Sequence, residues 1–578
     1  MKISSGKAWP ALPPRARVAD VRTNVVEYEL PALGQSMSPN LTSTGTGVVV
    51  SADVAIIGGG LGGVAAALAV VRAGGRAVLT DEFAWLGGQL TSQGVPPDEH
   101  AWIEQFGATA SYRALREGIR QYYRDHYPLT ETARANARLN PGAGLVSKLC
   151  HEPRVAASVI DAMLAPYRSN GRLVVLQPFA PVSSEHDAGT VRSVTVADGD
   201  GNTVTIYAPY ILDATETGAL LPLTGTEYVT GAEASTEFDE PSAPPVADPG
   251  NVQAITWCFA FDHADGDNTI DKPADYEFWR DYQPDFWGDR LLSFTAPDPR
   301  TLVPVTRTMV VNPDLVDGRD SDQSLSGGDS DLWMFRRIAA RSNFVPGTYD
   351  SDIVMANWPM LDYLEASVLD NPDAAQHFEA ARQLSLSYFY WLQTEAPRPD
   401  GGTGWPGLRL RGDVLGTADG LAQAPYIRES RRIKAVTTVT ERDISVAASA
   451  DPGPATFAKS VGVGMYRIDL HPSTGGDNYI DVECRPFEIP LGALLPRSTT
   501  NLIAASKNIG TTHITNGAYR LHPVEWNVGE SAGELAMFCL REGTTPHAVE
   551  ESDELTARFQ TRLQTSGIEI HWPVIAGY

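Results

Sequence analysis

Residues 51–82, SADVAIIGGGLGGVAAALAVVRAGGRAVLTDE, contain the pattern that decides the fold. The apolar run from Val54 to Ile57 predicts a buried strand, and Gly58-x-Gly60-x-x-Gly63 follows it directly. A helix rich in alanine comes next, and the second apolar run, RAVLTD, closes the segment. A strand, a glycine turn, a helix and a strand make one βαβ unit, which predicts an α/β domain with a parallel sheet.

The spacing of the glycines gives each of them a role. Gly58 permits a tight turn, Gly60 lets the backbone approach a pyrophosphate, and Gly63 allows the helix to pack closely on the strand. The helix begins with Leu61 and Gly62, and its first N–H groups present a positive dipole end to phosphate. Such a turn can also be purely structural, but the strand before it and the helix after it favour dinucleotide binding.

Two carboxylates follow at the distance that this fold requires. Asp81 ends the second strand about 20 residues after the glycine turn, and Glu82 comes next. An acid at this place accepts hydrogen bonds from ribose hydroxyls. The unit therefore predicts a dinucleotide, and its periodicity does not decide between FAD and NAD.

Composition sets the class of protein. A chain of 578 residues and 62.3 kDa is larger than one hydrophobic core supports, so we expect more than one domain. The net charge of −26 repels phosphate backbones and argues against a nucleic-acid partner. No apolar run approaches the roughly 18 residues of a membrane span. The opening segment, MKISSGKAWPALPPRAR, lacks the apolar centre of a secretory signal, so we expect a retained extension and no membrane partner.

Cysteine and histidine spacing argues against disulfides and metals. The 4 cysteines (Cys150, Cys258, Cys484 and Cys539) form no CxxC pair, and the 11 histidines show no HxxxH or HxH spacing. We therefore expect reduced structural thiols, a cytoplasmic location and no metal site.

Other elements are predicted from local patterns. Short apolar or alternating runs predict strands over 173–176, 191–196, 203–207 and 210–213. Residues 374–396 read as one long helix. From about 233 to 326 the chain is rich in Pro, Asp and aromatic residues, which favours a separate substrate-side cap.

Four segments, in order along the chain, resemble a known family. Trp85-Leu-Gly-Gly-Gln-Leu-Thr-Ser-Gln-Gly and Ile211-Leu-Asp-Ala-Thr-Glu-Thr-Gly resemble segments of glutathione-reductase-type flavoproteins, which bind FAD on a Rossmann fold. Arg428-Glu-Ser-Arg-Arg resembles a segment of bacterial FAD-dependent oxidoreductases. Residues 489–533, IPLGALLPRSTTNLIAASKNIGTTHITNGAYRLHPVEWNVGESAG, are similar to the last FAD motif of these proteins. The resemblance implies FAD as the cofactor.

The resemblance also implies the fold. We expect an α/β chain in which a discontinuous, Rossmann-type FAD-binding domain with a parallel sheet carries an inserted α+β substrate/cap domain. The expected parts are an N-terminal extension (1–50), the FAD-binding domain (51–232 and 480–545), the substrate/cap domain (233–479) and a C-terminal extension (546–578).

The resemblance further implies which residues bind FAD. The implied contacts outside the first βαβ unit are Gly87, Gly88 and Gln89 beside the pyrophosphate, Phe179 and Ala180 at the adenine, Ala214 and Thr215 near the pyrophosphate, and Asn508. A helix from near Pro523 would bring backbone N–H groups of Val524, Glu525, Trp526 and Asn527 to the pyrimidine end of the flavin. This chain departs from the pattern in two places: it has Lys507-Asn508 where relatives often carry Arg-Cys, and ATET where many carry ATG.

Candidate catalytic groups surround the last motif. His513, Arg520 and His522 flank the turn that the resemblance places at the flavin. An imidazole can act as a base and a guanidinium can hold a carboxylate or an enolate. A histidine in such a turn can equally bond a neighbouring carbonyl.

Three further sets of residues are candidates. His471 lies where a predicted strand enters a polar loop, and we include it among the catalytic candidates. Asp98, Glu99 and His100 could be acid/base groups, although residues of this kind more often cap a helix. The arginines of the segment 428–432 could hold an anion, or could join two domains through Arg–Glu pairs.

The leading hypothesis is an FAD-dependent oxidoreductase, either an oxidase or a dehydrogenase. It would oxidise a small organic metabolite by two electrons, with hydride passing to the flavin and oxygen or another electron acceptor reoxidising it. No second GxGxxG motif marks a nicotinamide domain. The alternatives are a flavin monooxygenase that uses NAD(P)H and oxygen, or a non-redox lyase or isomerase that keeps FAD. The oligomeric state stays open, a homo-oligomer included.

Overall fold

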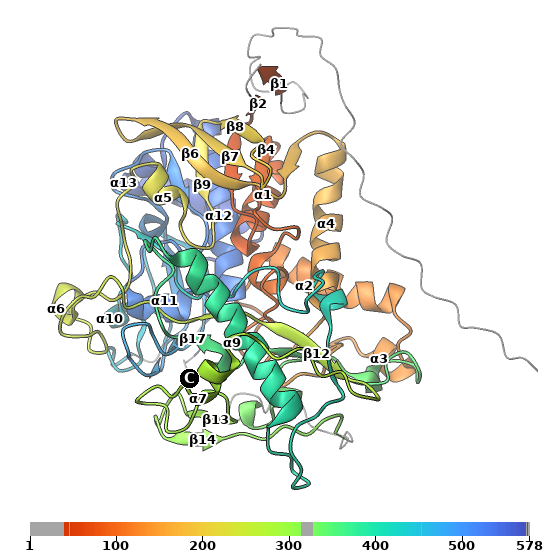
Figure 1. Ribbon diagram of the computed structural model, residues 1–578. Helices are drawn as coiled ribbons and strands as arrows, with labels where there is room; N and C mark the ends of the chain where they lie inside the picture. Colours follow the sequence, from red (N-terminus) through yellow and green to blue (C-terminus); the bar gives the residue numbers. More distant parts are fainter. Residues whose placement is uncertain (1–39, 45–46, 314–327, 452, 574, 576–578) are drawn as a thin grey trace, which may run out of the picture.

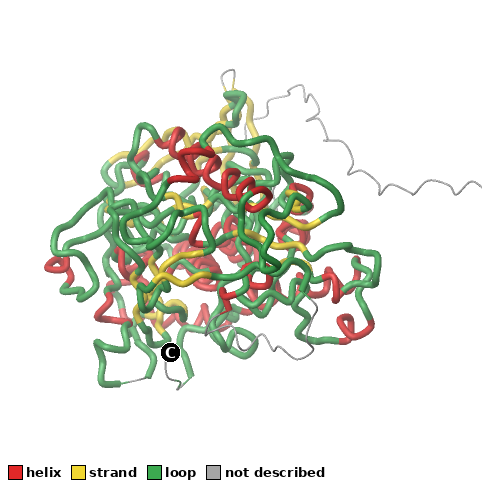
Figure 2. The backbone as a smooth tube through the Cα atoms, turned by 60° about the horizontal axis from the view of Figure 1, so that its bottom comes forward, coloured by secondary structure: helices red, strands yellow, loops and turns green. Residues whose placement is uncertain are grey.

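The computed structural model describes residues 40–44, 47–313, 328–451, 453–573 and 575. Most of the expected N-terminal extension, up to residue 39, lies outside the described residues. Long loops connect short strands and helices over much of the chain (Figure 2). Across the described ranges, no helix has both the length and the apolar character needed to cross a lipid bilayer.

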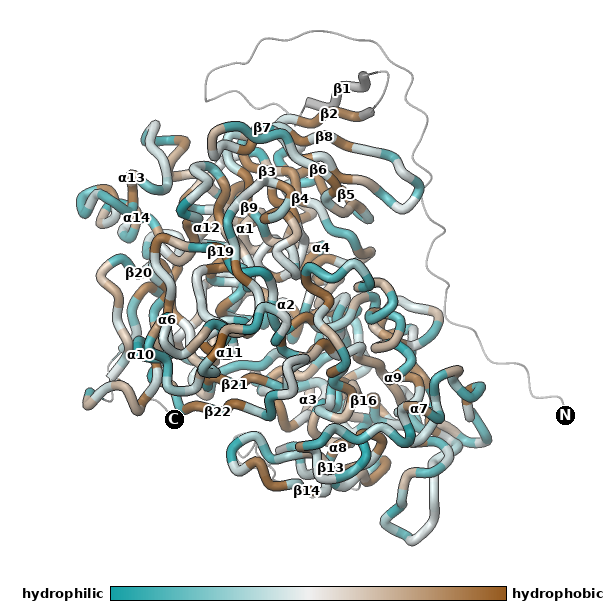
Figure 3. Tube along the Cα trace, turned by 60° about the vertical axis from the view of Figure 1, so that its left-hand side comes forward, coloured by the Kyte–Doolittle hydropathy of each residue, from teal (hydrophilic) through white to brown (hydrophobic). Residues whose placement is uncertain are grey.

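A five-stranded parallel sheet contains both strands of the first βαβ unit. Its order is β24 (Leu502–Ala504), β9 (Tyr210–Asp213), β3 (Val54–Ile57), β4 (Ala77–Thr80) and β5 (Leu173–Leu176). The residues of β3, β4 and β9 are buried on both faces of the sheet, and the tube drawn by hydropathy is brown along β3 and β4 (Figure 3). The sheet confirms the predicted α/β class with a Rossmann-type parallel sheet. The edge strand β24 comes from a part of the chain far from the other four strands.

Two helices from opposite ends of the chain pack together on this sheet. Helices α1 (Leu61–Arg72) and α12 (His522–Glu542) lie side by side (Figure 1). A Cβ placed on Gly529 of α12 would lie 1.9 Å from the carbonyl oxygen of Gly62, and one on Gly533 would lie 2.6 Å from that of Ala66. The two helices therefore touch backbone to backbone, and glycine is required where they cross.

A second sheet covers one end of the first. Its order is β1 (Asn40–Thr44), β2 (Gly47–Ser51), β8 (Thr203–Tyr207), β7 (Thr190–Ala197) and β6 (Ala180–Asp187). Strand β2 is parallel to β8, and the other neighbours are antiparallel. The predicted strands 173–176, 203–207 and 210–213 are confirmed, and β7 is longer than predicted.

The middle of the chain forms smaller sheets around a long helix. Strands β15 (Arg337–Ala339), β16 (Ile353–Ala356), β12 (Phe259–His263) and β18 (Leu408–Leu410) make one sheet. Helix α9 (Ala374–Thr394), which confirms the helix predicted over 374–396, packs Phe389 on Phe259 with ring centroids 5.4 Å apart. Two short pairs lie nearby: β11 (Ile255–Thr256) with β17 (Asp362–Tyr363), and β21 (Ile468–Leu470) with β22 (Ile480–Val482).

Candidate active site

The glycine turn after β3 has the geometry that its sequence predicts. Gly58 has a φ of +103°, and a Cβ there would lie 2.2 Å from the carbonyl oxygen of Ala214 at the end of β9. A Cβ on Gly63 would lie 1.9 Å from the carbonyl oxygen of Gly58. The turn, the start of α1 and the end of β9 are therefore in backbone contact, and side chains at Gly58 and Gly63 are excluded.

A first cavity of about 170 Å³ opens above this turn. Its wall brings together nine of the predicted ligands, which come from four separate segments of the chain: Gly58, Gly60, Asp81, Glu82, Gly88, Phe179, Ala180, Ala214 and Thr215. Gly87 lies behind the wall, where its N–H donates to the carbonyl of Gly59 at 2.7 Å. Leu61, Gly62 and Gly63 belong to the first turn of α1 beneath the cavity.

Asp81 is the acid at the end of β4. Its Oδ1 accepts a hydrogen bond from the N–H of Phe83 at 2.7 Å, and its carbonyl accepts one from the N–H of Phe179 at 2.7 Å. Burial raises the pKa of this carboxyl well above its ordinary value, and Glu82 and Glu216 raise it further. The carboxyl is thus held at the cavity with its second oxygen unused by these backbone bonds.

The two departures from the family pattern meet in space. The Lys507 ammonium bonds the carboxylate of Glu216 and lies 3.7 Å from Oε2 of Glu525. Lys507 is fully buried, and burial alone would lower its pKa, but Glu216 and Glu525 hold that pKa above its ordinary value. Oε1 of Glu216 lies 2.5 Å from the position of a Cβ on Gly60 and 2.4 Å from that of one on Gly88. The half-buried carboxylate of Glu216 therefore lies over the glycine turn.

Glu525 closes the other side of this cluster. Its Oε1 accepts a hydrogen bond from the N–H of Gly62 at 3.2 Å, so it caps the N-terminus of α1. Gln89 donates its side-chain amide to Glu525 and to the carbonyl of Arg520 at 2.9 Å. Asn508 donates to the carbonyl of Asp213 at 3.1 Å and so ties the end of β24 to β9.

The predicted role of the α12 backbone needs correction. The helix begins at His522, and the N–H of Glu525 already donates to the carbonyl of Leu521 at 2.8 Å. Trp526 and Asn527 lie further along, where helical N–H groups bond within the helix. The expectation that Glu525, Trp526 and Asn527 present free N–H groups is therefore wrong, because only the first helical positions leave these groups unbonded.

The side chains of Trp526 and Asn527 point elsewhere. Trp526 donates its indole N–H to the hydroxyl of Ser111 at 2.7 Å, and Asn527 donates to the carbonyl of Val463 at 3.2 Å. Both bonds fasten α12 to neighbouring segments.

A second cavity of about 320 Å³ is lined by residues from the middle of the chain, between 298 and 481, together with Asp98 and Val146. His471 is the predicted catalytic residue on its wall, and Asp98 shares that wall. Gly88 and Ser92 line the first cavity, so the loop from Gly88 to Asp98 runs from one cavity to the other. His522, at the start of α12, accepts a hydrogen bond from the N–H of Asp98 at 3.1 Å through its Nδ1.

His471 is backed by a buried carboxylate. Its Nδ1 lies 2.6 Å from Oδ2 of Asp362, which is fully buried. Asp362 also accepts the hydroxyl of Thr256 at 2.5 Å and pairs with Arg428 at 3.1 Å. A proton on Nδ1 facing Asp362 leaves Nε2 of the neutral ring as an acceptor. The arrangement is that of an oriented general base.

Charges around this pair keep the histidine neutral. Burial lowers the pKa of His471, the Arg428 cation lowers it further, and Asp362 raises it in part. Burial alone would raise the pKa of Asp362, but Arg428 and His471 bring it below its ordinary value. At neutral pH the pair is therefore a carboxylate beside an uncharged imidazole.

The other three catalytic candidates lie behind the cavity walls. His513 pairs with Glu429 at 2.9 Å, within a buried network that includes Arg432 and Glu233. Arg520 donates to the hydroxyl of Tyr426 at 2.6 Å. It also donates, at 2.9 Å, to the carbonyl of Asp469, which lines the second cavity. Each is placed to support the site.

His522 also lies behind the wall. Burial lowers its pKa to about 3, so the ring is neutral. Among the described residues, its Nε2 has no hydrogen-bond partner.

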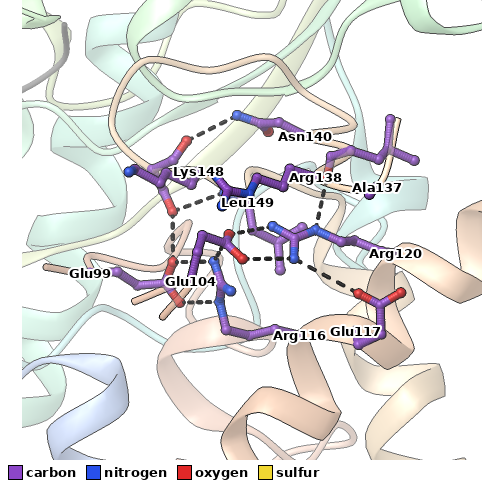
Figure 4. A network of polar contacts seen from close by, with 12 residues as sticks. Glu99, Glu104, Arg116, Glu117, Arg120, Ala137, Arg138, Asn140, Lys148 and Leu149 are labelled. Atoms are coloured by element: carbon purple, nitrogen blue, oxygen red, sulfur yellow. Dashed lines mark hydrogen bonds and ion pairs between the residues drawn. The ribbon is translucent and has the colours of Figure 1, made fainter. Parts of the chain in front are cut away.

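The segment that follows Asp98 is held by a network of ion pairs to α2 (Ala110–His126). Arg116 donates to Glu99 at 2.8 Å and to Glu104 at 2.8 Å, and Arg120 donates to Glu104 as well (Figure 4). These pairs fix the segment that follows Asp98. Glu99 was a candidate acid/base group, and the structure places it in this network.

A comparison with known families assigns the chain. The model of a family described as FAD dependent oxidoreductase matches residues 53–563. The chain belongs to this family. It is therefore an FAD-dependent oxidoreductase, and FAD is its cofactor.

Comparisons with individual proteins are more distant. No curated protein matches this oxidoreductase. Solved structures similar to it include L-proline dehydrogenase from P. horikoshii (17% identity, 32% of this chain and 24% of that one, TM-score 0.17) and an anhydrotetracycline hydroxylase from Streptomyces rimosus (14%, 38% and 38%, 0.22). Another is a glycerol-3-phosphate dehydrogenase from Bacillus halodurans in complex with FAD (15%, 37% and 44%, 0.22). In each case the match spans less than half of the length of the solved structure.

The first cavity fits the adenosine side of FAD in this oxidoreductase. The glycine turn contributes Gly58 and Gly60 to the cavity wall without side chains, and Asp81 and Phe179 line the same cavity. The exception is Glu216, whose carboxylate lies over the glycines where a phosphate approaches in this fold. The neighbouring Lys507 offsets that charge.

Proposed function

We propose that the protein oxidises a small organic molecule by two electrons in the second cavity, with His471 as the base. The observation that carries this proposal is the bond between His471, which lies on the wall of that cavity, and the buried Asp362. The bound FAD supplies the hydride acceptor. The donor loses one hydrogen as a proton to Nε2 of His471 and one as hydride.

The chain's own residues prepare the proton transfer. Asp362 holds the proton on Nδ1 and orients the ring, and Arg428 keeps Asp362 ionised. The lowered pKa of His471 leaves its base form populated at neutral pH. After proton transfer, the imidazolium lies beside the Asp362 carboxylate, which stabilises it.

The remaining assignments follow from the resemblance and belong to the same proposal. We assign a bacterial, cytoplasmic enzyme of the glutathione-reductase type with oxygen or another electron acceptor. The FAD-binding domain would be 51–232 with 480–545, around a substrate/cap domain at 233–479. The parallel sheet supports this division, because β24 joins strands from the first 213 residues. An NAD(P)H-dependent monooxygenase and an FAD-containing lyase or isomerase are the alternatives.

The test is anaerobic reduction of the bound flavin. With a compound that bleaches the flavin of the unaltered enzyme, H471Q should lower the reduction rate constant by about 10²–10⁴, the usual contribution of a general base. Its bound FAD should stay at full stoichiometry, because His471 lies in the second cavity. The exposed His126 offers a matched control, and H126Q should reduce as fast as the unaltered enzyme. Rapid bleaching by NADPH without any organic compound would instead support the monooxygenase.

A further inference from the structure

The charged side chains on the wall of the second cavity already have partners. Arg307 pairs with Asp329 at 2.7 Å, and Arg467 pairs with Asp481 at 2.8 Å. All four of these residues line the cavity. Each pair cancels one positive and one negative charge.

The other charged side chains on the wall are paired less closely, and Arg300 lies 3.8 Å from Asp481. Asp469 accepts from Arg520 at 3.2 Å, Asp298 accepts from the N–H of Thr301 at 2.8 Å, and Asp98 lies 3.7 Å from Arg336. Four arginines and five aspartates line the cavity, and Arg520 adds a fifth cation beside Asp469, so the positive and negative charges of the described wall are equal in number. A neutral ligand keeps this balance.

The same wall is rich in polar atoms that lack partners. Tyr479 has an unpartnered hydroxyl, Asn357 an unpartnered carbonyl oxygen and Trp358 an unpartnered indole N–H, counted over the described residues. Nε and Nη1 of Arg336 also lack partners there. These groups comprise donors and acceptors together, and buried polar groups of this kind are normally hydrogen-bonded. A ligand that satisfies all of them must both donate and accept, which hydroxyl groups do.

Aromatic rings complete the wall. Phe335, Trp358, Tyr466 and Tyr479 line the cavity and provide apolar faces among the polar groups. Such faces pack against the C–H surfaces of a molecule whose edges carry hydroxyls. The volume of about 320 Å³ is at the small end of the range for ligand pockets.

We infer that the second cavity binds a neutral polyhydroxylated compound, a sugar or sugar alcohol, and that one of its alcohol groups is the group oxidised. The inference rests on the proposed function. The O–H proton passes to Nε2 of His471, the carbon gives its hydride to bound FAD, and the C–O bond becomes a carbonyl. When bound, FAD would supply the acceptor for the two electrons that the alcohol loses, and oxygen or another electron acceptor would reoxidise it.

A panel of compounds tests the class of substrate on the FAD-loaded enzyme. The panel contains neutral polyols (D-glucose, sorbitol and myo-inositol), hydroxy acids (lactate and gluconate), benzyl alcohol and L-proline. Binding is measured by saturation-transfer NMR and calorimetry, and flavin bleaching is measured anaerobically. At least one neutral polyol should bind and bleach the flavin, and the hydroxy acids, benzyl alcohol and proline should bind at least roughly tenfold more weakly, a difference of about one hydrogen bond.

One conservative substitution ties binding to this wall. Y479F removes only the hydroxyl and should weaken binding of the polyol by roughly tenfold, because one buried hydrogen bond is lost. Tyr390 on α9 is not on the wall, and Y390F should leave the affinity unchanged. Equal affinities in Y479F and in the unaltered enzyme would overturn the assignment of the cavity.

The remaining outcomes separate the inference from the proposed function. A polyol that binds in a Tyr479-dependent way without bleaching the flavin would leave the ligand class standing and overturn the proposed oxidation. A hydroxy acid, benzyl alcohol or proline that binds and bleaches while every polyol fails would overturn the ligand class and keep the oxidation. Absence of binding by the whole panel would overturn the inference.

Discussion

Glu216 is the residue whose position most directly opposes the cofactor. Its carboxylate lies over Gly60 and Gly88, and the first cavity has Asp81 and Glu82 on its wall as well. We expect E216Q to bind FAD roughly tenfold more tightly than the unaltered protein, since one negative charge near the diphosphate is removed. Calorimetry of the apoprotein with FAD measures this.

A control variant and a contrary result test the expected effect of E216Q on FAD affinity. E237Q changes an exposed glutamate and should leave the FAD dissociation constant unchanged. If E216Q binds FAD more weakly, Glu216 is a ligand of the cofactor and its charge is needed.

K507M leaves Glu216 and Glu525 without their cation, so we expect it to lose FAD affinity.

His471 should set the acid side of the pH profile. Its pKa lies below the ordinary value of 6.5, and the neutral ring is the active form. The flavin reduction rate constant should therefore be level at neutral pH and fall only as pH drops below about 6.5. In D362N the ring loses its oriented proton, so the rate constant should be lower at every pH. A profile that bends above pH 6.5 in the unaltered enzyme would contradict this assignment.

Sequence and structure agree at the residues whose roles depend on near neighbours. Gly58 and Gly63 were predicted from spacing alone, and both make the expected backbone contacts. The pair of His471 and Asp362 was not predictable, because the partners are 109 residues apart and meet only when β17 and β21 come together. The same holds for Glu216 and Lys507, which are 291 residues apart.

At the scale of elements, the contact between α1 and α12 controls the site. Gly529 lets the two helices touch, and G529A would push a methyl group into the carbonyl of Gly62. Overpacking of this kind costs at least about 1–3 kcal/mol, so we expect a lower midpoint of thermal unfolding and weaker FAD retention. Gly199, beside which a Cβ meets nothing within 4 Å, is the control, and G199A should leave both unchanged. A G529A protein with the unaltered midpoint would show that the helices separate without cost.

Local sequence patterns predict several elements, but they do not show which N–H groups of a helix are free. Strands β5, β8 and β9 and helix α9 follow from apolar periodicity. The start of α12, expected near Pro523, lies at His522. The pattern does not show which N–H groups are free at this start, and the N–H of Glu525 already donates within the helix. Free N–H groups were therefore assigned too far along the helix.

At the scale of the whole molecule, buried charges join distant parts of the chain. Glu429 accepts from Arg432 and from the N–H of Gln253, and it pairs with His513 on α11 (His513–Tyr519). Burial alone would raise the pKa of Glu429, but His513 and Arg432 lower it to about 2 from an ordinary value of 4.5. Its contribution to stability is therefore complete above pH 4.5 and is lost as pH falls toward 2.

Removal of this charge should expose that dependence. E429Q leaves Arg432 and His513 with less compensation, and we expect a loss of about 3–5 kcal/mol at neutral pH. The part of the acid destabilisation between pH 4.5 and 2 that belongs to Glu429 should disappear, as measured by denaturant unfolding at each pH. E277Q, in the exposed pair of Glu277 with Lys272, should change neither quantity. A normal acid profile in E429Q would assign the acid sensitivity to other carboxylates.

Strand β24 and helix α12 pack on elements that the ribosome makes much earlier, and this has a consequence for folding during translation. The glycine turn leaves the ribosome early, but the strand and helix that complete its surroundings begin at Leu502 and His522. At about 5–20 residues per second, synthesis from the end of α1 to the end of α12 takes roughly 20–100 seconds, and the buried face of α1 stays uncovered for that time. The FAD site is therefore complete only after α12 has been synthesised.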